Sequence, residues 1–136
     1  GVSPFISYKR ALGDKNSLVG FLFPMGKRHT PENAIGFIHV IRRKLKGSLS
    51  KISPPFYQIK QVLVGKDNQR VGAGTALVNW VLSRADSLPI MAQVMPFNKS
   101  AISFYKKRGF NLKETILCGK NKDRKEYILV KSAKSA

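Results

Sequence analysis

The stretch Gln69-Arg70-Val71-Gly72-Ala73-Gly74 constrains this chain more than any other. An extended, branched run at residues 59–64 leads into it, and an amphipathic segment at residues 75–86 leads out of it. The order strand, glycine-containing turn and helix points backbone N–H groups at one spot, at the positive end of a helix dipole. Glycines carry no Cβ, so a ligand can approach the backbone closely. The pattern indicates a phosphate or pyrophosphate site, with plain turn and cap chemistry as the alternative.

The size and composition predict one folded domain over residues 1–136, because 43% of the residues are hydrophobic. The apolar runs are too short to span a bilayer, and the N-terminus has no signal-peptide layout. Cys118 is the one cysteine, which excludes an internal disulfide and a cysteine-rich zinc site. The two histidines have no carboxylate cluster near them in the sequence. These features predict no metal and an intracellular, cytoplasmic location.

The charge is strongly positive: Lys and Arg total 25 against 7 Asp and Glu, a net charge of +18. Such a field attracts polyanions, so RNA or DNA is the first partner to expect, and an acidic protein face or a membrane comes next. A positive surface that serves only solubility is the alternative. The basic residues expected to hold phosphates are Arg42, Arg43, Lys44, Lys46, Lys106, Lys107 and Arg108.

Alternation and turn signals predict strands over residues 17–23, 34–41, 56–64, 89–95, 111–118 and 125–131. Helical spacing predicts helices over residues 75–86 and 99–108, with Asn98 as the N-cap of the second. Residues 2–14 indicate no more than an extended lead-in or one turn of helix. The strand at 56–64, the helix after it and the apolar strand at 89–95 form a right-handed βαβ unit with parallel strands.

A second motif follows the first at a fixed distance. It consists of Asn98, Ala101, Phe104, Tyr105, Gly109 and Phe110. The run from Gln69 to Gly74 matches the pattern Gln/Arg-x-x-Gly-x-Gly/Ala. With these two motifs the chain resembles the GNAT superfamily, the Gcn5-related N-acetyltransferases. The resemblance covers residues 56–112. The resemblance implies an α/β fold with a mixed, mostly antiparallel sheet, a central parallel βαβ unit and helices on both faces. Few residues precede the strand at 17–23, so the family's N-terminal helices are expected to be reduced or absent.

The resemblance also implies the activity, an N-acetyltransferase that uses acetyl-CoA. The turn and helix start would hold the pyrophosphate of coenzyme A, and the strand before them would hold the pantetheine arm. The cofactor-binding residues implied in this way are Val62, Leu63, Val64, Gln69, Arg70, Val71, Gly72, Ala73, Gly74, Thr75 and Asn98. A backbone N–H of that strand would polarise the thioester carbonyl. Tyr105 would be the general acid that protonates the departing thiolate, with aromatic packing as the alternative reading.

The acceptor is less constrained than the donor. Many family members carry a glutamate base on the strand before the turn, whereas Gln58, Lys60 and Gln61 stand there in this chain. An α-amine, with a pKa of about 8, needs less help to lose its proton than a lysine amine at about 10.4. Together with the charge, this favours the α-amine of an RNA-borne amino acid, as in GNAT toxins that act on charged tRNA.

Other acceptors and another class stay open at this point. A protein N-terminus, including a ribosomal one, or a small amine would fit the same enzyme class. A second subunit in a homodimer would complete an acceptor site that lacks the N-terminal helices. The alternative class is a non-catalytic module of this fold that binds nucleic acid or CoA.

Overall fold

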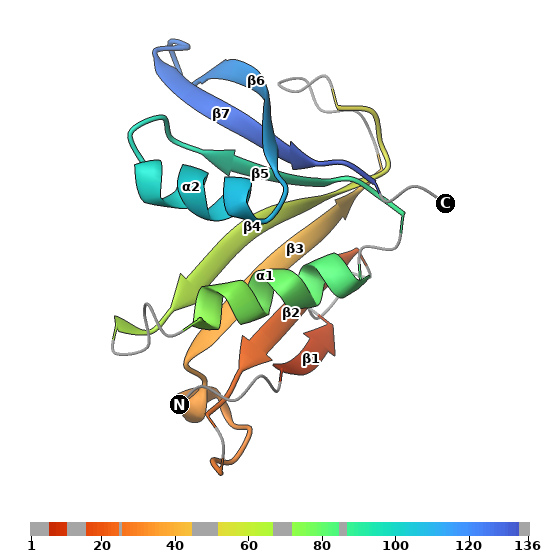
Figure 1. The fold of residues 1–136 in the computed structure, drawn as a ribbon, viewed down its shortest axis with the longest axis vertical. Coiled ribbons are helices and arrows are strands. Elements are labelled where there is room, and N and C mark those ends of the chain that lie inside the picture. Colours follow the sequence, from red (N-terminus) through yellow and green to blue (C-terminus); the bar gives the residue numbers. More distant parts are fainter. Residues whose placement is uncertain are drawn as a thin grey trace. The chain divides into compact units, whose positions relative to one another are not determined.

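The computed structural model describes residues 6–10, 16–24, 26–44, 52–66, 72–84 and 87–133. Its strands are β1 (Ile6–Arg10), β2 (Ser17–Leu22), β3 (Gly36–Arg43), β4 (Phe56–Val64), β5 (Ile90–Val94), β6 (Asn111–Cys118) and β7 (Arg124–Lys131). Its helices are α1 (Ala73–Arg84) and α2 (Lys99–Lys107), with a short 3-10 helix at Pro31–Asn33. The strand order is β1-β2-β3-β4-β5-β7-β6 (Figure 1). Within the described ranges no helix has the length and hydrophobicity needed to cross a membrane.

The chain divides into two compact units. The first contains β1, β2, β3 up to Ile41, β4 from Ile59 onwards, and α1. The second contains the remaining residues of β3 and β4, together with β5, α2, β6 and β7. A single domain over residues 1–136 therefore stays a prediction.

In the first unit an antiparallel sheet carries α1 (Figure 1). The helix buries Leu77, Val78 and Trp80, and the six-membered ring of Trp80 lies against the backbone of Gly20 in β2. This packing follows from the broadly apolar face of the helix, which must be covered by another element. The helix starts two residues earlier than the range 75–86 predicted from the sequence, because Ala73 and Gly74 are already helical.

Residues Ile6–Arg10 form β1, which pairs antiparallel with β2. The extended lead-in expected here is therefore confirmed for these residues, and the single turn of helix is wrong for them. Local sequence did not reveal the strand, because its five residues are mostly polar and its hydrogen-bonding partner is a separate strand, β2. Ile6 is opposite Leu22, a pairing that depends on a contact distant in sequence.

In the second unit β5, β7 and β6 form an antiparallel sheet, and β6 and β7 make a long hairpin (Figure 1). One core cluster includes side chains of this sheet, and its members are Ile52, Phe56, Met91, Ile116, Cys118 and Ile128 with Val130 beside them. At the start of β4 the backbone N–H of Tyr57 donates to the carbonyl of Pro89 at 2.9 Å. Strand β4, helix α1 and strand β5 thus form the parallel βαβ unit within an otherwise mostly antiparallel sheet, which confirms the predicted fold class.

Candidate functional site

The turn that opens α1 ends at Gly72, whose φ of 86° lies in the left-handed region that favours glycine. The carbonyl of Gly72 accepts the first helical hydrogen bond, from Ala76 N–H at 2.9 Å, so Gly72 is the N-cap residue. The first turn of α1 contains no acidic side chain. Gly72 is exposed, and a Cβ built on it would meet no atom of the described residues within 4 Å. The described residues thus place no acidic side chain in this first turn to compete with an anion for the positive end of the dipole.

Ala73, Gly74 and Thr75, expected to bind the cofactor, form that first helical turn. Ala73 is buried and the other two are partly buried. The other three residues of the predicted turn, Gln69, Arg70 and Val71, lie outside the described residues. The structure thus describes the helical half of the predicted pyrophosphate site.

The end of β4 is the second part of the predicted donor site. A Cβ on Gly36 would lie 3.0 Å from the carbonyl oxygen of Leu63, so the backbones of β3 and β4 approach closely there. Gly65 N–H donates to the carbonyl of Ile35 at 2.7 Å, which holds the chain beside β3 as it leaves β4. The side chain of Leu63 is 49% exposed, while Val62 and Val64 are partly buried. An apolar ligand arm laid along this strand end would cover the exposed leucine.

Asn98 begins α2 in the second unit. Its side-chain Oδ1 accepts a hydrogen bond from Ala101 N–H at 3.1 Å, which confirms the predicted N-cap. Only the carbonyl oxygen serves this cap, and among the described residues no partner is seen for the Nδ2 donor. The amide group can therefore cap the helix and donate to a ligand at the same time.

Tyr105 is 8% exposed and packs between two aromatic rings of the same unit. Its centroid lies 5.3 Å from that of Phe104, edge to face, and 5.1 Å from that of Phe110. Burial raises the pKa of Tyr105 to about 12. No hydrogen-bond partner for the hydroxyl occurs in the described part of the chain. The phenol thus keeps its proton throughout the physiological pH range, as a general acid must.

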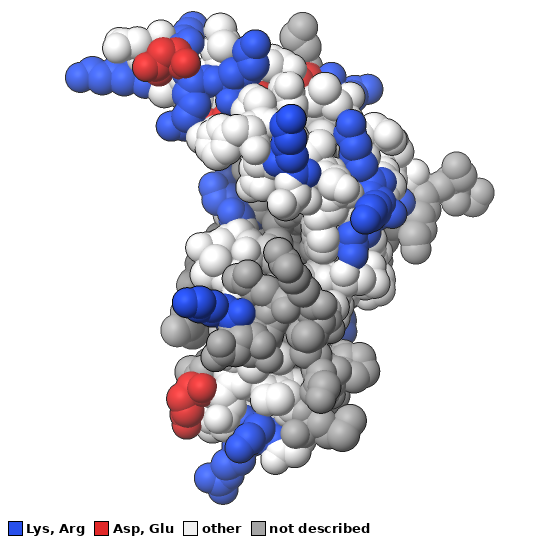
Figure 2. All heavy atoms as spheres, turned by 60° about the vertical axis from the view of Figure 1, so that its left-hand side comes forward, with Lys and Arg blue, Asp and Glu red and all other residues white. Residues whose placement is uncertain are grey.

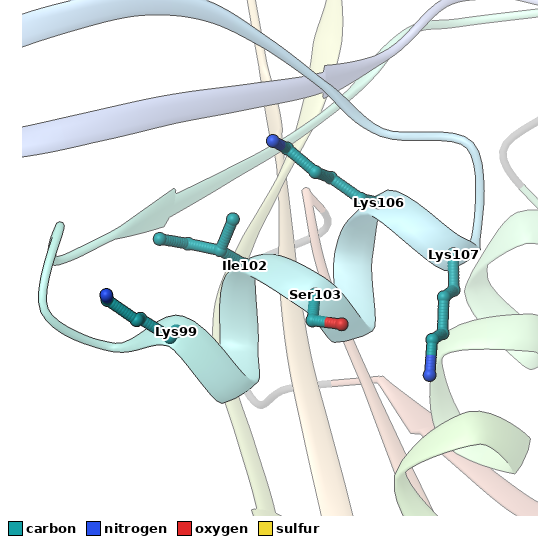
Figure 3. A pocket seen from close by; sticks show the side chains of 5 residues that line it. All are labelled: Lys99, Ile102, Ser103, Lys106 and Lys107. Atoms are coloured by element: carbon teal, nitrogen blue, oxygen red, sulfur yellow. The ribbon is translucent and has the colours of Figure 1, made fainter.

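Two lysines expected to contact polyanions, Lys106 and Lys107, line a hollow of about 440 Å³ on α2 (Figure 3). The other lining residues are Lys99, Ile102 and Ser103. Arg108, which follows in sequence, is not among them. Its Nη1 donates to the carbonyl of Phe104 at 2.7 Å, and its Cζ lies 3.8 Å from the centroid of the Phe104 ring. Arg108 therefore holds the end of its own helix.

The basic residues at the end of β3 and directly after it also differ in their contacts. Arg42 and Lys44 are exposed, whereas Arg43 Nε donates to Oε1 of Gln58 at 2.8 Å. Lys46 lies outside the described residues. Figure 2 shows the wider pattern on one face, where Lys and Arg side chains recur over the described surface and Asp and Glu are few.

Sequence reasoning missed a polar cluster centred on Glu126 in the second unit. The residue is 8% exposed, and its carboxylate accepts from Arg124 Nε at 2.9 Å and from Gln93 Nε2 at 3.1 Å. Burial alone raises the pKa of Glu126, but hydrogen bonds from Arg124, Gln93 and Cys118 outweigh it and lower the pKa below its ordinary value. The one available signal was the inward position of Glu126 in an alternating strand. No three His, Cys, Asp or Glu residues of the described chain form a metal-binding group.

The family model of the Acetyltransferase (GNAT) family matches residues 4–110, so this chain belongs to the GNAT acetyltransferase family. It is an acetyl-CoA-dependent N-acetyltransferase, and both the enzyme class and the cofactor expected from the sequence are confirmed. A comparison with curated protein sequences gave no match.

Solved structures show the same fold. A structure described as histone acetyltransferase HPA2 and related acetyltransferase, from Corynebacterium glutamicum, superposes with a TM-score of 0.69 at 16% identity, over 90% of this chain and 67% of that one. The ribosomal-protein-S18-alanine N-acetyltransferase from Escherichia coli superposes with a TM-score of 0.67 at 17% identity, over 90% of this chain and 73% of that one. Arabidopsis thaliana Naa50, in complex with the bisubstrate analogue CoA-Ac-MVNAL, superposes with a TM-score of 0.62 at 25% identity, over 84% of this chain and 72% of that one.

Proposed function

We propose that this acetyltransferase binds the pyrophosphate of coenzyme A at the start of α1. The observation that carries the proposal is the helix start at Gly72, with its positive φ and a first turn without acidic side chains. Ala73, Gly74 and Thr75 form the first helical turn at this site, and Gln69, Arg70 and Val71, which precede it in sequence, are the other residues proposed to contact the pyrophosphate. Val62, Leu63 and Val64 hold the pantetheine arm, and Asn98 donates to it through Nδ2.

The reaction proposed for this donor is direct acetyl transfer. A neutral amine attacks the thioester carbonyl carbon, the C–N bond forms, and a backbone N–H at the end of β4 stabilises the negative charge on the oxygen. The C–S bond then breaks, and the sulfur leaves with the proton of the Tyr105 hydroxyl. The resulting phenolate takes up the surplus proton of the new amide nitrogen. The pKa of Tyr105, raised to about 12, makes that phenolate a strong base, so the acid is regenerated.

The acceptor in this proposal is an α-amine. No carboxylate stands on β4, and Gln58, which occupies a position where many relatives carry a base, is already hydrogen-bonded to Arg43. At pH 7 about one α-amine in ten is neutral, against fewer than about one lysine amine in a thousand, from pKa values of about 8 and 10.4. An enzyme without a strong side-chain base therefore works best on an α-amine.

The charge favours an RNA-borne amino acid as the carrier of that amine. A net charge of +18 attracts the phosphates of RNA, as in an aminoacyl-tRNA, more strongly than a neutral peptide. Arg42, Lys44, Lys106 and Lys107 are exposed and suited to phosphate contacts. A cytoplasmic location, contact with DNA and a homodimer stay predictions.

A protein N-terminus is the second candidate acceptor. Arabidopsis Naa50, at 25% identity, was crystallised with a CoA–peptide bisubstrate analogue, so a fold like this one accommodates a peptide in that relative. Such an acceptor carries the same α-amine and needs no RNA contact.

Parallel acetylation assays with three acceptors test these assignments. Purified enzyme with acetyl-CoA is given aminoacyl-tRNA, a short peptide with a free N-terminus, or an Nε-amine peptide with a blocked N-terminus, and free CoA thiol is measured. We expect turnover with aminoacyl-tRNA and none with uncharged tRNA. Faster turnover of the peptide would favour the second candidate. Acetyl-CoA binding without turnover of any amine would support the non-catalytic alternative.

A further inference from the structure

We propose that the hollow on α2 is a phosphodiester-binding subsite for the RNA that carries the acceptor, which rests on the proposed function. Its lining residues, Lys99, Ile102, Ser103, Lys106 and Lys107, recur at helical spacing and so form one face of α2. Figure 3 shows Lys99 and Lys106 extending to either side of Ile102, and Lys107 extending in the other direction near Ser103. The hollow adds Lys99 and Ser103 to the expected phosphate contacts and leaves out Arg108.

Electrostatics indicate that this face is arranged for an anion. The helix contains three lysines and no acidic residue, and none of these lysines takes part in an ion pair with any described residue. Lys106 and Lys107 are at the C-terminal end of α2, where cations are favourable. Lys99 is at the first helical position, where the positive end of the dipole opposes a cation. Helix stability therefore explains two of the charges and not the third, whereas a polyanion with several phosphates along this face would stabilise all three.

The other lining groups favour a nucleotide unit over a bare inorganic anion. A volume of about 440 Å³ is far larger than a phosphate needs. Ser103 supplies a hydroxyl that can donate to a phosphate oxygen or to a ribose. Ile102 is partly buried between the charged groups and offers an apolar surface to a sugar or base. Lysines around an apolar residue match an RNA strand, which presents charged phosphates together with the apolar faces of its bases.

The first test compares two variants with equal loss of charge. One carries Lys99→Ala, Lys106→Ala and Lys107→Ala, and the other carries Lys113→Ala, Lys120→Ala and Lys125→Ala at exposed positions of β6, its loop and β7. Binding of a fluorescent single-stranded RNA of about 12 nucleotides is measured by anisotropy from about 50 to 300 mM KCl. We expect the hollow variant to bind at least about tenfold more weakly and its salt slope to fall by about 2.

The matched variant should lose no more than about threefold in RNA affinity, since scattered charges act only through the general field. Equal losses in both variants would overturn the proposal, because the hollow would then be no special contact. Should the triple hollow variant fail to fold, Lys99→Glu alone takes its place. It reverses one charge at the helix start and is expected to weaken RNA binding at least about tenfold more than Lys113→Glu, by the same phosphate argument.

A second arm separates RNA from the phosphorylated end of coenzyme A itself, which has the same chemistry. Calorimetry compares CoA with dephospho-CoA on the wild type and the hollow variant. If the hollow variant binds CoA and dephospho-CoA as tightly as the wild type does, the result supports the RNA subsite. A hollow variant that loses affinity for CoA but not for dephospho-CoA would assign the hollow to the cofactor and overturn the proposal.

Failure of the proposed function is distinguishable from failure of this subsite. If the enzyme acetylates no RNA-borne amine but the hollow variant still loses RNA affinity selectively, the acceptor assignment is wrong and the hollow stands as an RNA site. If aminoacyl-tRNA is acetylated with the same kcat/KM by the wild type and the hollow variant, the acceptor assignment stands and the subsite is wrong.

Discussion

A Cβ on Gly20 would lie 2.6 Å from Cζ3 of Trp80, a separation shorter than any real contact of that kind. Strand β2 and helix α1 therefore meet where only a hydrogen atom fits between backbone and indole. Trp80 is 9% exposed and part of the core of its unit. The position of the helix that begins at the proposed pyrophosphate site thus depends on a glycine about fifty residues earlier in the chain.

Gly20→Ala is expected to lower the free energy of unfolding by about 1–3 kcal/mol, because the added methyl group overpacks a core contact. The measurement is chemical denaturation at neutral pH. Trp80→Phe removes the ring atoms that clash, so Gly20→Ala should be milder in that background. A double-mutant cycle without coupling would show that the two residues do not meet as described.

Glu126→Gln is expected to destabilise the second unit by about 1–3 kcal/mol at neutral pH, because a buried charge-assisted network loses its charge. Arg124→Ala is the matched control. This substitution should lower the free energy of unfolding by less than about 1 kcal/mol, since the side chain of Arg124 is 54% exposed and its ion pair is screened by water.

The same carboxylate predicts how stability depends on pH. The pKa of Glu126 is lower in the folded chain than its ordinary value of 4.5. The contribution of this carboxylate to the free energy of unfolding is therefore complete above pH 4.5. It is lost as the pH falls from there through the pKa of the folded state. Unfolding curves of the wild type and Glu126→Gln across that window should converge towards low pH. A constant difference between them would contradict the lowered pKa.

Tyr105→Phe should lower kcat by about 10²–10⁴-fold and leave the KM for acetyl-CoA nearly unchanged, because it removes a proton donor. The ring keeps its contacts with Phe104 and Phe110, so the melting temperature should change little. Steady-state kinetics and a thermal melt of the same sample measure both effects. Turnover near the wild-type value with saturating acetyl-CoA would assign Tyr105 to packing alone.

The raised pKa of Tyr105, about 12, predicts a further property of the wild type. Deprotonation of the acid is displaced above the ordinary tyrosine pKa of about 10, so kcat should show no loss assignable to Tyr105 below that pH. A decline of kcat near pH 8–9 that disappears in Tyr105→Phe would mean that the free-state pKa does not persist in the ternary complex.

Substitutions at Gly72 separate backbone conformation from bulk at the donor site. Its φ is 86° and a Cβ would meet no described atom within 4 Å, so the expected effect is conformational. Asn tolerates the left-handed region, whereas a β-branched residue does not. Gly72→Val should weaken CoA binding by about tenfold or more, from about 1–3 kcal/mol of backbone strain, and Gly72→Asn much less. If calorimetry gave the same CoA affinity for Gly72→Val and Gly72→Asn, the proposed role of the turn would be contradicted.

Features that depend on neighbouring residues were predictable from the sequence alone. The bounds of β4 agree with the predicted range because its alternation of side chains is local. The cap of α2 by Asn98 was predictable for the same reason, since its hydrogen bond to Ala101 N–H spans three residues. The two motifs determined the family and the cofactor, which the comparisons confirm.

Contacts between distant residues were decided only by the tertiary structure. Strand β1 exists through its pairing with β2, and the buried carboxylate of Glu126 is satisfied by Gln93, 33 residues away. Charge counting treated Arg108 and Lys107 alike, yet one guanidinium packs on Phe104 while the adjacent lysine lines the hollow. Local pattern determines which element a residue belongs to, whereas packing determines which of its groups are left for a ligand, because burial and hydrogen bonding depend on partners that the chain brings together only on folding.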